Sequence, residues 1–499
     1  MPRFSTSSPE KTAALPGRDR LFLALLAVLS VAGYLFISQR YYRVGFPLDD
    51  AWIHQVYART LIEHGEWAFR PGQPSAGSTS PLWSVLLAVG FPLRLAPYCW
   101  AYLIGGFLLW GIALAVEKGV RQAIPAYRPP FPFAGALLTL EWHLVWAAVS
   151  GMETLLYGTL VTVILLSLMA ESRRYVQTGF LIGISLWVRP DGITLLAPAV
   201  LTALLAERRW RQRGYALLGL FLGCGALILA YLVFNLTLSG VPWPNTFYAK
   251  QAEYAVLRQA PLLKRYFNQW LPPLTGAGIL LLPGAIVWLV VAWRRRAWGA
   301  LAGMFWFVAY LGLYAWRLPV TYQHGRYVMP AMGIFFAWGL LGLWRLATTP
   351  ASPRGARLAV MGWRIGVYAL VLLFWVQGGL AYARDVAFIE SEMVATARWV
   401  EAHLPPQALV AAHDIGALGY FDSHPLLDLA GLVSPQVIPF LRDEARLAQY
   451  LDEQAVDYLV VFPDWYPSLT AGRAPIFVTH APYAPAQGGT NMAVYRWKP

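Results

Sequence analysis

The sequence predicts a polytopic α-helical membrane protein with a small α/β domain after its last span. Hydrophobic residues make up 58% of the 499 positions and charged residues only 13%, a balance too apolar for a soluble chain of this length. Apolar runs of about 17–25 residues, long enough to cross a hydrocarbon core of about 30 Å, recur between short basic turns. After residue 383 the apolar runs shrink and charged residues become common.

The net charge of +13 does not indicate a nucleic-acid partner. Lysine and arginine concentrate in the turns between apolar runs, as the positive-inside rule predicts for cytoplasmic loops. Cys99 and Cys224 both lie in apolar runs, which argues against a disulfide framework or a thiolate metal site. No small-residue cleavage site follows the first apolar run, so we expect an uncleaved first span.

The basic turns set the predicted topology. Residues 1–20 form a cytoplasmic tail, and residues 21–383 form a membrane domain of about 11–13 transmembrane helices. A carboxylate-bearing external loop (about 39–80) follows the first span, and residues 81–95 form an interfacial or re-entrant helix. The expected crossings are 21–38, 100–116, 131–149, 155–170, two within 176–206, 215–238, 279–293, 298–316, 328–343 and 365–382.

Residues 384–499 are predicted to form an extracytoplasmic α/β domain. Short alternating segments near residues 409–411, 458–462 and 493–495 are β-prone, and helical patterns cover 390–403 and 441–454. The stretch from His413 to Tyr420 is typical of a strand end followed by a glycine-rich turn, which we expect to face the membrane domain.

Asp49 and Asp50 are the first candidate catalytic residues, because two adjacent carboxylates just outside a span are costly to place. One can act as a general base on a hydroxyl, and its neighbour can bind a donor phosphate through a divalent cation or set the pKa of the base. The structural alternative is that both begin the helix predicted over residues 51–64, where aspartate caps free N–H groups. The two roles are compatible.

Further charged residues fall in turns on the same predicted side of the membrane. Glu153 is a second external carboxylate, with a helix N-terminal role as its alternative. Arg189 and Asp191 form a local ion pair in a hairpin turn, an interpretation we favour over ligand binding. Three more candidates are cations, of which arginine binds phosphate through two parallel hydrogen bonds: Lys250, His324 and Arg326.

The external loop contributes the remaining candidates. Thr79, Ser80 and Trp83 belong to a Ser-Thr-Ser-Pro-Leu-Trp segment that fits a helix start, with a hydroxyl at the N-cap and proline in the first turn. His54 lies one turn after the paired carboxylates. We assign these four residues to acceptor binding or to the loop itself.

Several short motifs in this order resemble the GT-C glycosyltransferases. The similarity is closest to the bacterial branch that includes the terminal arabinofuranosyltransferases of mycobacterial cell walls, and it covers most of the chain, from about residue 49 to residue 432. The motifs are Asp49-Asp50-Ala-Trp-Ile, Thr79-Ser80-Pro81-Leu82-Trp83, Gly151-Met152-Glu153-Thr154, Arg189-Pro190-Asp191-Gly192, Pro244-Asn245-Thr246 with Lys250, Arg326-Tyr327 and Asp414-Ile415-Gly416.

The resemblance implies a polyprenyl-phosphate sugar donor and inversion at the anomeric carbon. The acceptor would be a glycan, lipid or protein on the outer face of the plasma (inner) membrane. The base of the family maps onto Asp49 or Asp50 and its second acidic residue onto Glu153. Lys250 and Arg326 would bind the donor phosphate, together with His324, Arg189 and Tyr327. Whether a divalent cation (Mg²⁺ or Mn²⁺) binds at Asp49 and Asp50 is not decided by the resemblance. Arg70-Pro71-Gly72 departs from the asparagine-glycine pattern of the family, so the resemblance does not identify the sugar.

Two other classes of function are consistent with such a chain. A secondary transporter also carries membrane carboxylates and broken helices, but it needs charges near the midplane and repeated halves, and we find no repeat. A non-catalytic membrane protein that binds through its outer domain would tolerate neutral substitutions at Asp49 and Asp50.

Overall fold

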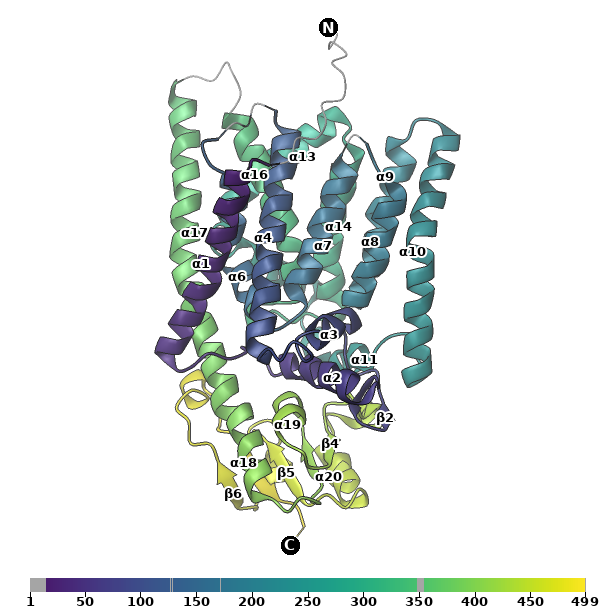
Figure 1. The fold of residues 1–499 in the computed structure, drawn as a ribbon, viewed down its shortest axis with the longest axis vertical. Coiled ribbons are helices and arrows are strands. Elements are labelled where there is room, and N and C mark those ends of the chain that lie inside the picture. Colours follow the sequence, from purple (N-terminus) through teal and green to yellow (C-terminus); the bar gives the residue numbers. More distant parts are fainter. Residues whose placement is uncertain (1–14, 126, 128, 171, 348–353, 499) are drawn as a thin grey trace.

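The computed structural model describes residues 15–125, 127, 129–170, 172–347 and 354–498. Most of the expected cytoplasmic tail (residues 1–14) and the expected basic-turn residue Arg128 lie outside these ranges. The described chain is a bundle of long helices with a smaller domain at one end, and the two termini lie at opposite ends of the molecule (Figure 1).

The bundle contains most of the predicted crossings as separate helices. Its members are α1 (Gly17–Tyr41), α4 (Pro97–Ala123), α5 (Phe133–Leu140), α6 (Trp142–Ala148), α7 (Thr154–Met169), α8 (Tyr175–Val188), α9 (Leu196–Ala206), α10 (Trp210–Ser239), α13 (Gly278–Arg295), α14 (Trp298–Arg317), α16 (Met332–Ala347) and α17 (Arg354–Ile389). Among the described residues, seven helices are long and apolar enough to cross a membrane, and three further apolar helices are shorter. The chain is therefore a multi-pass membrane protein, and the number of 11–13 crossings stays a prediction.

The predicted crossing at residues 131–149 is not a single helix. α5 ends at Leu140 and α6 begins at Trp142, because Glu141 adopts an extended backbone conformation and accepts a hydrogen bond from the Leu144 amide as the N-cap of α6. The break places Glu141 beside His143, whose Nδ1 lies 2.8 Å from its Oε1.

Small residues allow close contact between neighbouring helices of the bundle. In the pair α8 and α10, a Cβ atom on Gly179 would lie 2.1 Å from the Leu220 carbonyl oxygen, and one on Gly223 would lie 2.2 Å from that of Val176. Close backbone contact of this kind is a main source of helix association in membranes.

Short elements lie between the bundle and the smaller domain. After α1, the chain forms α2 (Asp50–His64), a hairpin of β1 (Ala68–Arg70) and β2 (Gln73–Pro74), and α3 (Pro81–Ala88). Figure 1 shows α2 and α3 lying across the end of the bundle. The other elements of this layer are η1 (Pro190–Leu195), α11 (Asn245–Glu253), η2 (Ala255–Gln259), α12 (Leu262–Leu274), α15 (Tyr322–Gly325) and η3 (Met329–Ala331).

The smaller domain is built on a five-stranded mixed sheet in the order β4-β3-β5-β7-β6. β4, β3 and β5 are parallel, and β7 pairs antiparallel with both β5 and β6. The strands are β3 (Val410–Ala412), β4 (Leu426–Asp428), β5 (Tyr458–Val461), β6 (Pro475–Val478) and β7 (Ala493–Arg496), and the helices are α18 (Ala395–His403), α19 (Gly416–Phe421), η5 (Pro435–Phe440), α20 (Glu444–Glu453), α21 (Pro467–Thr470) and η6 (Pro485–Gln487).

The last bundle helix continues directly into this domain. α17 is followed by a π-helical turn, η4 (Glu390–Val394), and then by α18. The turn buries two carboxylates that face different parts of the molecule. Glu390 accepts a hydrogen bond from Tyr98 (2.6 Å), whereas Glu392 accepts hydrogen bonds from Thr479, Asn491 (2.8 Å) and the Met492 amide (2.8 Å).

Candidate active site

Asp49 connects the external loop to the sheet domain. Its Oδ2 and Oδ1 accept hydrogen bonds from the backbone amides of Gly416 (2.7 Å) and Ala417 (2.8 Å), at the start of α19. The expectation that Asp49 caps the helix over residues 51–64 is wrong, because its side chain bonds no amide of α2 although the residue occupies the N-cap position. The segment after His413 faces the loop that carries Asp49, as expected, but Gly416–Phe421 form the helix α19 rather than a glycine-rich turn.

Burial and the nearby Asp414 carboxylate raise the pKa of Asp49 to about 7, against the opposing effect of the two amide bonds. Each oxygen of the Asp49 carboxylate thus accepts one main-chain hydrogen bond, and the residue joins the start of α19 to the loop that precedes α2. Arg59 supports the same contact by donating to the carbonyl oxygens of Gly419 and Tyr420.

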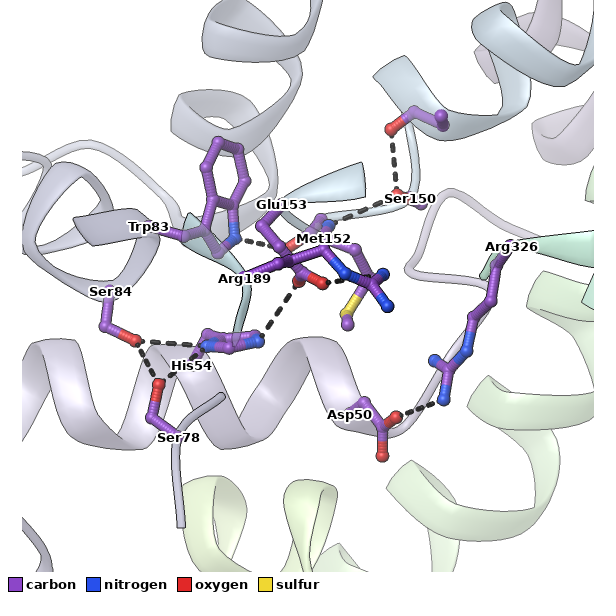
Figure 2. A network of polar contacts seen from close by, with 12 residues as sticks. Asp50, His54, Ser78, Trp83, Ser84, Ser150, Met152, Glu153, Arg189 and Arg326 are labelled. Carbon is purple, nitrogen blue, oxygen red and sulfur yellow. Dashed lines mark hydrogen bonds and ion pairs between the residues drawn. The ribbon is translucent and has the colours of Figure 1, made fainter. Parts of the chain in front are cut away.

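Asp50 has a different environment, one helix position later. Its Oδ2 accepts hydrogen bonds from Arg326 Nη2 (2.6 Å) and Lys250 Nζ (3.0 Å) (Figure 2 shows the Arg326 contact). Burial alone would raise the pKa of Asp50, but the two adjacent positive charges hold it well below its usual range. Lys250 is contributed by α11, and Arg326 follows α15, so the site combines three distant segments.

Arg326 is held by an unusual turn. Gln323, His324 and Gly325 have φ values of 55°, 58° and 70°, a region that costs energy for residues other than glycine. A Cβ on Gly325 would also lie 2.4 Å from Pro272. The turn places the Arg326 guanidinium, 6% exposed, against Asp50, while within the described part of the chain its Nε and Nη1 have no hydrogen-bond acceptor.

Glu153 is the centre of a second, fully buried polar cluster. Its Oε2 lies 3.4 Å from His54 Nε2 and its Oε1 lies 3.5 Å from Arg189 Nη1. His54 Nδ1 in turn lies 3.2 Å from Ser78 Oγ and 3.1 Å from Ser84 Oγ, as Figure 2 shows. His54 and Glu153, predicted separately, are thus direct neighbours.

The Arg189–Asp191 ion pair is present, with 3.2 Å between Nε and Oδ1. Arg189 also donates to the Tyr314 hydroxyl (2.9 Å) and pairs with Glu153, and Asp191 accepts hydrogen bonds from Tyr310 (2.6 Å) and Tyr314 (2.8 Å). The pair therefore holds its turn and, because both tyrosines lie on α14, also connects that helix to the Glu153 cluster.

The loop residues have mainly structural surroundings. Trp83 donates from Nε1 to the Gly151 carbonyl oxygen (2.8 Å), which fixes the turn before Glu153 (Figure 2). Ser80 precedes α3 and is fully buried, but its side chain makes no capping bond, whereas Pro81 occupies the first turn as expected. Thr79 lines a cavity described below.

His324 lies apart from the Asp50 cluster although it neighbours Arg326 in sequence. Its Nε2 is 2.7 Å from Asp385 Oδ2, and its ring packs edge-on against Trp142 and Trp146. Tyr327 does lie in the cluster, because its hydroxyl accepts a hydrogen bond from Arg326 Nη2 (3.1 Å).

Two cavities meet at Asp50, Lys250 and Arg326, which line both. The larger cavity has a volume of about 1060 Å³ and lies between the bundle and the sheet domain. The smaller one, about 380 Å³, is mostly apolar. Its lining includes Thr79, Glu153, Arg189, Ile193, Trp243, Phe247, Leu313, Tyr314, Leu318 and Tyr327.

The paired aspartates do not form a cation site in this geometry. Both oxygens of Asp49 accept amide N–H groups, and Oδ2 of Asp50 faces two cations. In the described ranges, one group of three residues has the spacing of a metal site, formed by Glu401, Asp422 and His424 in the sheet domain.

Sequence reasoning missed several residues that line the larger cavity. Glu253, Asp385, Arg442 and Trp465 carry no motif, and their segments are far apart in sequence. Asp414 was part of a recognised motif but was interpreted as a turn residue. Its position directly after a strand was the signal that could have identified it.

The fold is similar to that of GT-C glycosyltransferases of known structure. The chain superimposes on ArnT from Cupriavidus metallidurans bound to undecaprenyl phosphate with a TM-score of 0.57, at 15% identity, covering 96% of this chain and 98% of that one. The oligosaccharyltransferase of Archaeoglobus fulgidus gives a TM-score of 0.60, at 10% identity, covering 89% of this chain and 70% of the other.

Sequence comparison finds a relative of the predicted kind. The terminal β-(1→2)-arabinofuranosyltransferase of Mycobacterium tuberculosis is 26% identical over 293 residues, which are 53% of this chain. The match spans 44% of that protein, so less than half of its length is matched. Residues 384–495 match a family model described as a domain of unknown function, DUF8728.

Proposed function

We propose that the protein is a membrane glycosyltransferase. It moves a pentose or hexose from a polyprenyl-phosphate donor to a hydroxyl of a cell-envelope glycan, lipid or protein, with inversion. The reaction takes place on the outer face of the plasma membrane, where the sheet domain lies. The observation that carries the proposal is the Asp50–Arg326–Lys250 cluster between two cavities, in which buried Arg326 keeps two nitrogens without an acceptor in the described structure.

The smaller cavity suits a lipid phosphate. Its lining is mainly apolar, while Arg189, Lys250 and Arg326 bring positive charge to one side of it. A guanidinium with unused donors binds phosphate oxygens in a fork geometry. The prenyl chain would lie among the apolar residues near Thr79, with the phosphate at Arg326 and Lys250 and the sugar directed toward the larger cavity.

Asp50 is the better candidate for the general base. Among the described residues its Oδ1 accepts no hydrogen bond, whereas both oxygens of Asp49 are occupied. When a donor phosphate takes over the positive charges of Lys250 and Arg326, Asp50 loses its stabilising partners, and its basicity rises. Donor binding and activation of the base are thus coupled.

The transfer then proceeds as a direct displacement. Asp50 takes the proton of the acceptor hydroxyl, whose oxygen forms a bond to the anomeric carbon. The bond from that carbon to the phosphate oxygen breaks, and the electron pair leaves with the lipid phosphate. Lys250 and Arg326 stabilise the negative charge that develops on the phosphate. Glu153 and His54 act in positioning, because they hold Arg189 at the wall of the donor cavity.

The test is sugar transfer from a polyprenyl-phosphate donor by purified protein in lipid nanodiscs. We expect Asp50→Asn to abolish transfer while donor binding and folding persist. Expression and size-exclusion profiles of Asp50→Asn, Asp49→Asn and Glu153→Gln are each compared with those of wild type to establish folding. If well-folded wild type consumes no lipid-linked donor, the enzyme proposal is wrong and the transporter alternative is tested next.

A further inference from the structure

The parallel strands of the sheet domain all end at the larger cavity. β4, β3 and β5 run in one direction, and the residues that follow their carboxyl ends line this cavity. In open α/β sheets, ligands bind in the crevice outside the carboxyl ends of the strands. The lining residues after the three strands are His413 and Asp414 after β3, Ala430 and Leu432 after β4, and Asp464, Trp465 and Tyr466 after β5.

Two of these side chains are available to a ligand. Trp465 is 42% exposed although it lies in a cavity wall, and its ring is fixed by contacts with Phe462 (5.0 Å between centroids) and His413 (5.5 Å). Oδ2 of Asp414 is buried and accepts no hydrogen bond within the described ranges. An exposed aromatic ring and an unused carboxylate oxygen in the wall of one cavity match a sugar, which has an apolar C–H face and hydroxyl donors.

The neighbours of these two residues form a rigid polar wall. His413 Nδ1 lies 2.6 Å from the Tyr466 hydroxyl, and its Nε2 lies 3.4 Å from Glu253 Oε1. Arg442 donates twice to the Glu253 backbone carbonyl, at 3.2 and 3.1 Å. These contacts tie α11, which carries Lys250, to the sheet domain, so a ligand on this wall is held in fixed relation to the Asp50 cluster.

We infer that this edge of the sheet is an acceptor subsite for carbohydrate, in which Trp465 stacks on a sugar ring and Asp414 accepts a hydrogen bond from a sugar hydroxyl. The inference rests on the proposed function and narrows it, because it selects a glycan as acceptor over a lipid or a protein. The wall carries carboxylates, a histidine, a tyrosine and an arginine, which suit hydroxyl groups better than an acyl chain. Burial raises the pKa of Asp414 to about 6, and the Glu253 charge adds to this effect, although His413 opposes it.

The test measures binding separately from transfer. Full-length protein in nanodiscs is titrated calorimetrically with oligosaccharides that end in arabinofuranosyl, galactosyl or mannosyl units, without any donor. We expect Trp465→Ala and Asp414→Asn each to weaken binding about tenfold or more, and Trp465→Phe to restore most of it. Trp210→Ala is the matched control, because Trp210 is 76% exposed at the start of α10 and lines neither cavity at the Asp50 cluster.

The outcomes separate the two proposals. The carbohydrate subsite is wrong if wild type transfers sugar only to a lipid or peptide hydroxyl. It is also wrong if Trp465→Ala and Asp414→Asn bind oligosaccharide as wild type does. In both cases the glycosyltransferase proposal stands. If oligosaccharide binds as expected but no lipid-linked donor is ever consumed, the transfer proposal is wrong while the sugar site remains. A failure of all three sugar classes to bind well-folded wild type overturns the subsite.

Discussion

Arg326 holds Asp50 through a single nitrogen. Nη2 lies 2.6 Å from Asp50 Oδ2, and Nε and Nη1 of the same buried guanidinium have no acceptor in the part of the chain that the structure describes. An unpaired buried donor costs about 1–3 kcal/mol. A phosphate oxygen that accepts a hydrogen bond from Nε or from Nη1 therefore recovers this cost for that donor.

Arg326→Lys is expected to weaken the donor step more than the acceptor step. Lysine keeps the charge but lacks the fork, so the KM for the lipid-phosphate donor should rise about 10- to 100-fold, the equivalent of one or two charge-assisted hydrogen bonds. Initial rates at varied donor concentration measure the change. Arg258→Lys, an exposed arginine on the neighbouring η2, is the matched control. An unchanged donor KM in Arg326→Lys would contradict the role in phosphate binding.

The two adjacent aspartates should separate in their effects. Asp50→Asn removes the proposed base and should lower kcat by about 100- to 10,000-fold. Because it also leaves the buried Arg326 and Lys250 without their carboxylate partner, its apparent Tm should fall as well. Asp49→Asn replaces one accepting oxygen by an amide that faces a backbone N–H, which should cost about 1–3 kcal/mol. Hydrogen exchange over residues 416–421 should then increase. Full loss of transfer in Asp49→Asn, without faster exchange, would reverse the assignment.

Asp414 should make stability depend on pH. Its pKa is raised to about 6 from an unfolded value of about 3.9, so folding favours the protonated form. The protonated Asp414 carboxyl therefore adds to the free energy of unfolding below about pH 4, and this stabilisation is lost as the pH rises through about 6. Asp414→Asn mimics the protonated acid, so its apparent Tm should exceed that of wild type above pH 6 and approach it near pH 4. Equal pH profiles would show that Asp414 titrates normally, despite its neighbours His413 and Glu253.

Glu392 should contribute strongly to the stability of the contact between η4 and the sheet domain. It is fully buried and accepts hydrogen bonds from Thr479, Asn491 and the Met492 amide. Glu392→Ala leaves those donors unpaired, so we expect a loss of several kcal/mol and faster proteolysis within residues 475–496. Limited proteolysis followed by mass spectrometry measures this effect. Glu453→Ala on exposed α20 is the control, and equal cleavage of both variants would contradict the prediction.

The sequence was informative wherever one local pattern decided the structure. Hydropathy identified the helices of the bundle, and β-prone alternation identified β3, β5 and β7. β4 (Leu426–Asp428) and β6 (Pro475–Val478) were missed, and β6 is partly exposed and contains a proline. The break at Glu141 escaped prediction, because a single capping carboxylate inside an apolar run leaves no periodic signal.

Candidate site residues were found individually, but their partners were not. Lys250 lies 200 residues after Asp50 in the chain, and Arg326 lies 276 residues after it. Capping of its own helix was the structural alternative for Asp49, since capping is a local rule, yet its amide partners lie 367 and 368 residues away. Such pairings follow from the way the bundle and the sheet domain pack together.

α17 continues through η4 into α18 without a break, so that one continuous helix connects the bundle to the sheet domain. One residue inserted before Glu390 would rotate everything beyond it by about 100°. Glu390 would then turn away from Tyr98 of the bundle, whereas Glu392 would rotate together with its partners Asn491 and Met492 in the sheet domain. The loops of the sheet domain can therefore change in length, but residues can be added to or removed from this continuous helix only in steps close to a full helical turn. A chimera that exchanges residues 395–498 between related proteins should retain activity only when the number of residues in the π-helical turn is kept.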